Sequence, residues 1–372
     1  MKLIPLTQVA AQIKAGAPLP WSVRDAHGGL LLARGNLIGG EAMRDTLVER
    51  GAFVDADEVR AGQRENSLPV GERRITLWSS LLTRLSLALQ DPAARGLETN
   101  LRGMATELAT LVQADPDMSQ AMLVHPELCA AYPYSVAHSA HVAATWALVA
   151  LRHEGSAPQA LTVPVAAALS MNIAMLSLQD RLTHLEGPLK AAHRAQIQQH
   201  PRQGAALLRA AGVTDPLWLA MVEQHHEDAG DSGDPGALPQ PLPEARRLRM
   251  MDVYCACFGA RAHRPPLLAD NAVRRLFQQY PKDPTALVLA KEFGLYPPGT
   301  VVRLASLELA LVVRRGPAAN APVAVALQNA SGEPRATPAR RDTSLPAHKV
   351  IAAVSPSLLR VRIPWAQLFT TF

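Results

Sequence analysis

The stretch VPVAAALSMNIAMLSL, residues 163–178, decides the fold class of this chain. A membrane-spanning helix needs about 20 apolar residues, and this run is shorter and contains Pro164 and Asn172. A second apolar run, VAATWALVAL at 142–151, is shorter still. Both runs predict buried helices in the core of a helical domain, and neither predicts a membrane span.

Helical periodicity extends on both sides of these runs. From Tyr134 to about Leu295 nearly every segment repeats its apolar residues at helical spacing, with short loops at glycines. Residues 75–123 repeat leucines in the same way and predict two or three further helices. Periodicity alone leaves two roles open for these helices, a dimer surface or packing on the helical domain.

Both ends of the chain carry strand and turn patterns. Residues 18–60 alternate short apolar runs with turn signals, and WSVRD, AHGG and LLLARGNLI among them predict a small hairpin. The segment after the hairpin predicts one helix that ends at Gly51. The polar stretch 62–74 is typical of a linker, and three short β-rich runs follow Tyr296. Residues 331–346 are typical of a loop.

The predicted fold is therefore mainly α, with an all-helical domain between small β-containing modules. Its parts are an α+β accessory module at 1–61, a linker with connecting helices at 62–125, the helical domain at 126–296 and a β-rich module at 297–372.

Composition restricts the function classes. The 372 residues are 48% hydrophobic and 19% charged, which is enough for ordinary packed cores. The net charge of +5 is scattered and aromatic residues make up only 4%, so we expect no specific nucleic-acid binding. The three cysteines form no CxxC pair, and polar residues interrupt any signal-peptide core near the start, so we expect a cytoplasmic protein.

Several histidines stand where metal chemistry would use them. YSVAHS, HPRQG and EQHHE supply His138, His200 and the pair His225–His226, and RMMDVYCA supplies Asp252. Imidazole nitrogens and a carboxylate are the ligand types of a transition-metal hydrolytic centre. Each histidine alone is more often a packed or solvated residue, so no single position is decisive. Four further histidines are interpreted as solvated helix residues: His141, His153, His184 and His193.

The order of these motifs resembles the HD-GYP family of metal-dependent phosphohydrolases, which hydrolyse the bacterial second messenger cyclic di-GMP. The resemblance covers about residues 134–295 and runs through YSVAHS, SMNIAM, HPRQG, EQHHE with SGDP, MMDVYCA and RAHRPPL. It implies an all-helical domain whose metal ligands are His138, His200, His225, His226 and Asp252. It also places Arg261 and Arg264 where guanidinium groups bind phosphate, although surface solvation explains them equally well.

Two departures from the family pattern matter for catalysis. The family's His-Asp-Ile-Gly-Lys corresponds here to Met171, Asn172, Ile173, Ala174 and Met175, so every ionisable member is lost. The resemblance assigns metal binding to the doublet and phosphate contact to the lysine, and neither a thioether nor an amide bridges two cations as a carboxylate does. In the signature loop, Gly233, Asp234 and Pro235 carry an acid in place of the tyrosine.

The resemblance thus implies a degenerate HD-GYP protein, a catalytically impaired signalling or scaffolding module in bacterial cyclic di-GMP signalling. The alternative is a phosphohydrolase that cleaves cyclic di-GMP or another phosphoester with a reduced metal site. The expected cofactor is one divalent ion, Fe, Mn or Zn, held by the later histidines with or without Asn172, or no metal at all. The expected partners are a signalling protein, a cyclic dinucleotide or a second copy of the chain.

Overall fold

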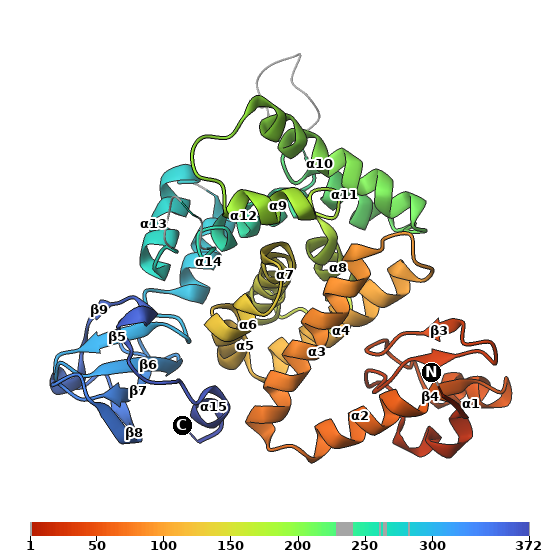
Figure 1. The fold of residues 1–372 in the computed structure, drawn as a ribbon, viewed down its shortest axis with the longest axis horizontal. Coiled ribbons are helices and arrows are strands. Elements are labelled where there is room, and N and C mark those ends of the chain that lie inside the picture. Colours follow the sequence, from red (N-terminus) through yellow and green to blue (C-terminus); the bar gives the residue numbers. More distant parts are fainter. Residues whose placement is uncertain (1, 228–240, 260–261, 263–265, 282, 372) are drawn as a thin grey trace.

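The computed structural model describes residues 2–371 except 228–240, 260–261, 263–265 and 282. It is mainly helical, with one small antiparallel sheet near each end of the chain. In Figure 1 the two sheets lie at the lower corners, and the helices between them form a broad mass with α7 at its centre. Among the described residues, no helix combines the length and apolarity needed to cross a membrane.

The N-terminal module is a four-stranded sheet in the order β1-β4-β2-β3 with one helix beside it. Its elements are β1 (Leu3–Pro5), β2 (Val23–Arg24), β3 (Leu30–Leu32), α1 (Glu41–Glu49) and β4 (Phe53–Asp55). The predicted hairpin is β2–β3, and the predicted helix is α1, which is followed by Gly51 at a positive φ of 68°. A small apolar core of its own includes Trp21, Ile38 and Val54.

The stretch predicted as a linker is helical, which corrects the prediction. Helix α2 (Ala56–Ser67) begins at Asp55, whose side chain accepts a hydrogen bond from the Asp57 amide, and α3 (Val70–Gln90) follows after one break. The prediction missed this helix because most of its residues are polar, although Val59 and Gly62 lie on a buried face. The division of the chain at residues 61, 125 and 296 stays a prediction.

The helices that follow share one large core. They are α4 (Leu97–Ala114), α5 (Pro116–Leu123), α6 (Pro126–Ala130), α7 (Tyr134–His153), α8 (Thr162–Ser170), α9 (Leu176–Thr183), α10 (Ala191–Ala210), α11 (Pro216–Gln224), α12 (Pro243–Cys255), α13 (Ala269–Gln279) and α14 (Pro284–Phe293). Helix α7 packs on α8 and α4, and the run 142–151 is buried in α7 except for Leu151, as predicted. The run 163–178 was predicted as one buried helix, but it forms α8, a turn at 171–175 and the start of α9, and Ser177 is exposed. Helices α3 and α4 contribute to the same core, so within this chain they pack on the helical region.

The C-terminal sheet has the order β8-β7-β6-β5-β9. Its strands are β5 (Val301–Leu304), β6 (Leu309–Arg314), β7 (Val323–Gln328), β8 (Pro334–Asp342) and β9 (Val350–Ala353). The first three are the predicted β-rich runs. Strand β8 lies in the segment predicted as a loop, and that prediction was wrong because β8 is an exposed edge strand, where proline and arginine are tolerated. The last helix, α15 (Trp365–Thr371), returns to pack on α3 (Figure 1).

Candidate metal centre

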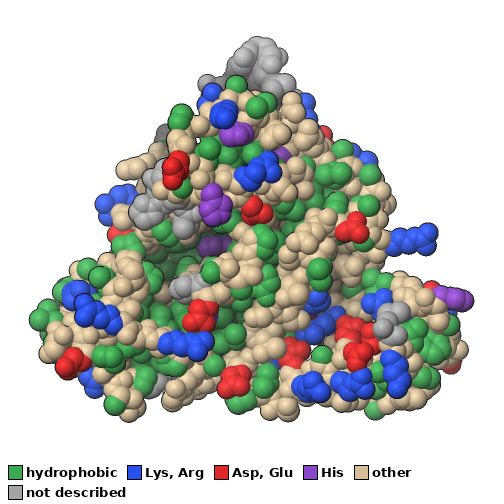
Figure 2. Space-filling view, in the orientation of Figure 1, with side chains coloured by type: hydrophobic (Ala, Val, Ile, Leu, Met, Phe, Trp, Pro, Cys, Tyr) green, Lys and Arg blue, Asp and Glu red, His purple; other side chains and the backbone are tan. Residues whose placement is uncertain are grey.

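Three histidines meet where α10 and the end of α11 pack together. The ligand nitrogens of His200, His225 and His226 all lie within 4.8 Å of one another. His200 and His225 are fully buried, whereas the His226 side chain is 35% exposed. Figure 2 shows histidine side chains reaching the surface over the helical region. The structure therefore brings together three of the five ligands that the resemblance implied.

Hydrogen bonds fix the protonation of the two buried rings. Nδ1 of His200 lies 2.7 Å from the Ile197 carbonyl oxygen, and Nδ1 of His225 lies 2.7 Å from the Val222 carbonyl oxygen. A carbonyl only accepts, so both protons reside on Nδ1. Burial, reinforced by the neighbouring imidazoles, lowers the pKa of His200 to about 4 and that of His225 to about 3, so both rings are neutral at pH 7.

The two Nε2 atoms consequently present lone pairs to each other. They are 3.2 Å apart, a separation at which two acceptors repel unless a cation lies between them. Two nitrogens bound to one tetrahedral zinc at the usual bond length are about 3.3 Å apart. The donor set and the separation of the His200 and His225 nitrogens therefore fit one transition-metal ion, with the imidazole of His226 within 4.8 Å as a third donor.

His138 and Asp252 form a separate pair beside this cluster. His138 Nε2 lies 2.6 Å from Asp252 Oδ1, while Asp252 Oδ2 is 4.0 Å from His226 Nε2. Burial opposes ionisation of Asp252, but the hydrogen bond with His138 and the nearby imidazoles outweigh it and hold the pKa below its usual value. The other two ligands that the resemblance implies, His138 of α7 and Asp252 of α12, are thus hydrogen-bonded to each other.

The turn at residues 171–175, which the resemblance aligns with the family doublet, lies against α10 where that helix meets α11. A Cβ on Gly204 of α10 would lie 3.4 Å from Val222 and 3.7 Å from the Met171 carbonyl oxygen. Gly204 is one helical turn from His200, and Val222 is one turn from His225, so the turn is in the layer of the histidines. Asn172 is 1% exposed, and neither atom of its amide has a hydrogen-bond partner among the described residues.

The unpartnered side-chain amide of Asn172 is a second feature that fits a metal ion at this site. A buried polar group without a partner costs about 1–3 kcal/mol, so native proteins rarely keep one. An amide oxygen is a neutral metal ligand and also hydrogen-bonds to metal-bound water. Asn172 therefore fits a site with one ion, but it lacks the charge needed to bridge two.

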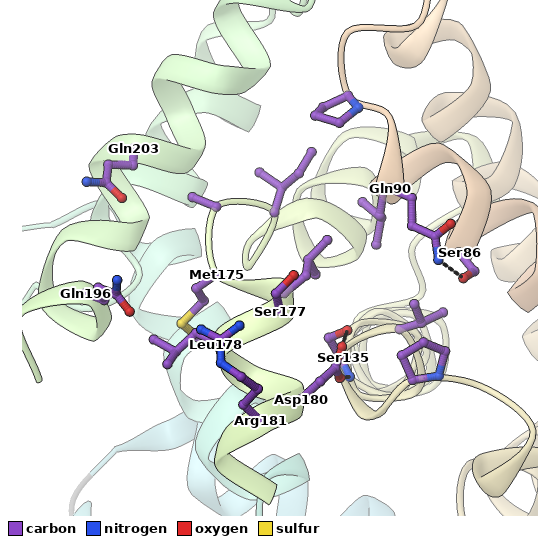
Figure 3. A pocket seen from close by; sticks show the side chains of 17 residues that line it. Ser86, Gln90, Ser135, Met175, Ser177, Leu178, Asp180, Arg181, Gln196 and Gln203 are labelled. Atoms are coloured by element: carbon purple, nitrogen blue, oxygen red, sulfur yellow. Dashed lines mark hydrogen bonds between the residues drawn. The ribbon is translucent and has the colours of Figure 1, made fainter. Parts of the chain in front are cut away.

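A cavity of about 480 Å³ opens next to this turn (Figure 3). Met175 lines it where the family pattern has lysine, together with Ser177 and Arg181 of α9 and Gln196 and Gln203 of α10. Among the described residues, no histidine lines this cavity. A thioether replaces an ammonium group at the position that the resemblance assigns to phosphate, which weakens the cavity's attraction for an anionic ligand.

The structure also shows a residue that the sequence gave no reason to select. Asp180 of α9 accepts hydrogen bonds from the Ser135 backbone amide at 2.7 Å and from its hydroxyl at 3.0 Å. It thereby caps the start of α7, the helix that carries His138. A cap supplied by another helix leaves no short-range signature, so only the tertiary structure could reveal it.

Other predicted positions have mixed outcomes. His141 was interpreted as solvated, but it is buried against Phe258, and burial lowers its pKa to about 3. His153 bonds Glu292 at 2.8 Å, whereas His184 is exposed. Arg261 and Arg264, like Gly233, Asp234 and Pro235, lie outside the described residues.

Comparison with known proteins adds one sequence relative. The chain is 27% identical over 225 residues to a cyclic di-GMP phosphodiesterase of Pseudomonas aeruginosa, a match that covers 57% of this chain and 54% of that protein. The chain thus matches about half the length of this curated relative. A solved Bdellovibrio bacteriovorus structure described as an HDG"Y"P protein superposes with a TM-score of 0.49 and 13% identity, covering 78% of this chain and 98% of that one. No family model matches the sequence.

Proposed function

We propose that the chain is a catalytically impaired member of the HD-GYP family, a signalling or scaffolding module of cyclic di-GMP signalling with at most one metal ion. The observation that carries the proposal is the buried Met171–Asn172 turn. It stands at the position of the family doublet and supplies no carboxylate to bridge two ions.

The ion would be held by His200, His225 and His226, with the Asn172 amide beside it. Bound there, a divalent ion would polarise a ligand oxygen or lower the pKa of a bound water. The protein's own contribution is to keep two imidazoles neutral through their Nδ1 hydrogen bonds and to orient their Nε2 atoms. His138 and Asp252 hold each other 2.6 Å apart instead of offering a second set of open ligands.

Two features argue against turnover of a cyclic dinucleotide. A two-ion site would need a carboxylate to hold both ions, and neither Met171 nor Asn172 supplies one. The cavity beside the turn has Met175 where the resemblance implies a phosphate-binding lysine. Because both the nucleophilic water and the phosphate contact are weakened, we expect the protein to bind a cyclic dinucleotide or signal its presence rather than hydrolyse it.

A residual phosphohydrolase is the second candidate function. The facing Nε2 atoms of His200 and His225 favour it, because they preserve a preformed site for one ion. Such a centre would cleave a phosphoester through a single metal-bound water.

The two candidates are separated by a turnover assay on the full chain. Purified protein supplied with Mn²⁺, Fe²⁺ or Zn²⁺ is incubated with cyclic di-GMP, and linear and fully cleaved products are quantified with and without chelator. The proposal predicts no chelator-sensitive product. In parallel, the double variant M171H/N172D should gain a second bound ion if the scaffold is otherwise intact, whereas chelator-sensitive turnover by the natural sequence would establish the phosphohydrolase instead.

A further inference from the structure

A second cavity lies where the C-terminal segment returns to the start of α3. Its volume is about 860 Å³, within the range of small-molecule sites. It is bounded by the first part of α3, by His125 and α6, and by residues 362–370. None of the residues assigned to the metal centre lines it, so its role is separate from the function proposed above.

The walls of this C-terminal cavity are largely apolar and already in place. Ile75, Leu128, Ile363 and Trp365 supply apolar surface. The α15 wall is held against α3 by backbone contact, since a Cβ on Gly71 would lie only 2.1 Å from the Ala366 carbonyl oxygen. A ligand would therefore meet a preorganised site and lose little affinity to ordering the protein.

One polar group in this apolar setting has an unused hydrogen-bond donor. His125 is 5% exposed, and its ring stacks on Trp365 with centroids 4.3 Å apart. Nδ1 of His125 accepts the hydrogen bond of the Leu128 amide at 3.2 Å, and burial lowers the pKa of this imidazole, so the neutral ring carries its proton on Nε2. In the described part of the chain, no hydrogen bond uses that Nε2–H.

The charges around the cavity disfavour strongly anionic ligands. The charged residues that line the cavity in the described part of the chain are two carboxylates, Glu72 and Glu127, and one cation, Arg362. Arg362 forms an ion pair with Glu127 at 3.2 Å. The side chains of this pair are 84% and 60% exposed, so the pair lies at the solvent side. A ligand with two phosphates would meet net negative charge here, whereas a neutral molecule would not.

We propose that the C-terminal cavity binds a small, neutral, planar heteroaromatic molecule whose acceptor atom takes the hydrogen bond from His125 Nε2. The flat ring would bury apolar surface against Trp365 and Leu128. The acceptor would take the Nε2–H hydrogen bond that no described residue receives, at a histidine that lines the cavity.

A matched pair of probes tests the proposal on the full-length chain. Isoquinoline and naphthalene have the same shape, but only isoquinoline carries a ring-nitrogen acceptor, which is unprotonated at mildly alkaline pH. Dissociation constants from ligand-observed NMR titration should show isoquinoline binding roughly fivefold more tightly, the ratio expected of one net hydrogen bond. The variant H125F keeps an aromatic ring beside Trp365 but lacks the donor, and it should remove this preference.

The control variant Q203A changes the other cavity and should leave the preference intact. Thermal unfolding of H125F establishes whether it remains folded, since His125 also caps α6. If H125F does not fold, the comparison of the two probes on the unmodified protein still decides. Equal affinities there, or no isoquinoline binding up to its solubility limit, would overturn the proposal.

Discussion

Replacing Gly103 of α4 by alanine should destabilise the protein, although alanine is the better helix former. The N-terminal module touches α4 at this point through its backbone. A Cβ on Gly103 would lie 2.4 Å from the Arg34 carbonyl oxygen and 3.0 Å from Asn36 Oδ1. Gly35, on the other side of the contact, has a positive φ of 89°, and its own Cβ would lie 2.3 Å from the Gly103 carbonyl oxygen.

A matched glycine isolates the steric part of the effect. Gly62 of α2 is also within a helix, but its nearest neighbours, Pro20 and Trp21, would be 3.9 Å from an added Cβ. At Gly62 alanine should stabilise by about 0.5–1 kcal/mol through backbone entropy. The same gain applies at Gly103, where overpacking costs about 1–3 kcal/mol in addition. The free energies of unfolding of the two variants should therefore differ by about 1–3 kcal/mol.

Urea unfolding followed by circular dichroism measures this difference. G62A should shift the midpoint upward, and G103A should shift it downward because the module must move away from α4. An Arg34 ion pair with Glu65 at 3.2 Å and another with Glu107 at 3.5 Å hold the module in the same place, so it cannot move without cost. Equal stabilisation by the two alanines would refute the close contact and the fixed position of the module.

Three further outcomes follow from the structure. D180A should lower the free energy of unfolding by about 1–2 kcal/mol, seen in urea titration, because it removes the cap that Asp180 provides to Ser135 at the start of α7. H225A should lose retained metal in equilibrium dialysis without loss of helical circular dichroism, whereas a variant that still binds one ion would place the metal elsewhere. The hydrogen bond from Arg341 outweighs desolvation and holds the pKa of Glu308 below its value of about 4.3 in the unfolded chain. The ionised Glu308 therefore stabilises the fold above that pH, and this stabilisation is lost as the pH falls through the folded-state pKa. The stability difference between the natural protein and E308Q should accordingly shrink in acid, and a difference independent of pH would contradict that reasoning.

Sequence reasoning succeeded where the signal was local. The apolar spacing of α7 and α8 and the β-rich runs of β5, β6 and β7 all gave the correct element type. It failed for α2, where polar residues cover the solvent face and only Val59 and its neighbours turn inward. It failed for β8 because Pro334 and Pro338 are typical of loops, and only the pairing with β7 makes the segment a strand.

The site divides in the same way. The ordered motifs selected His200, His225 and His226, and the structure brings them together. Nothing in the sequence predicts that two Nε2 atoms face each other, because this depends on how α10 packs against α11. The pairing of His138 with Asp252 depends in turn on the contact between α7 and α12.

Metal stoichiometry of the purified protein tests the central claim most directly. Elemental analysis after dialysis against Mn²⁺, Fe²⁺ or Zn²⁺ should give no more than one ion per chain, since His200, His225 and His226 form the one described cluster able to hold an ion and Asn172 cannot bridge to a second. Two tightly bound ions per chain would contradict this account and would require a bridging ligand other than Asn172.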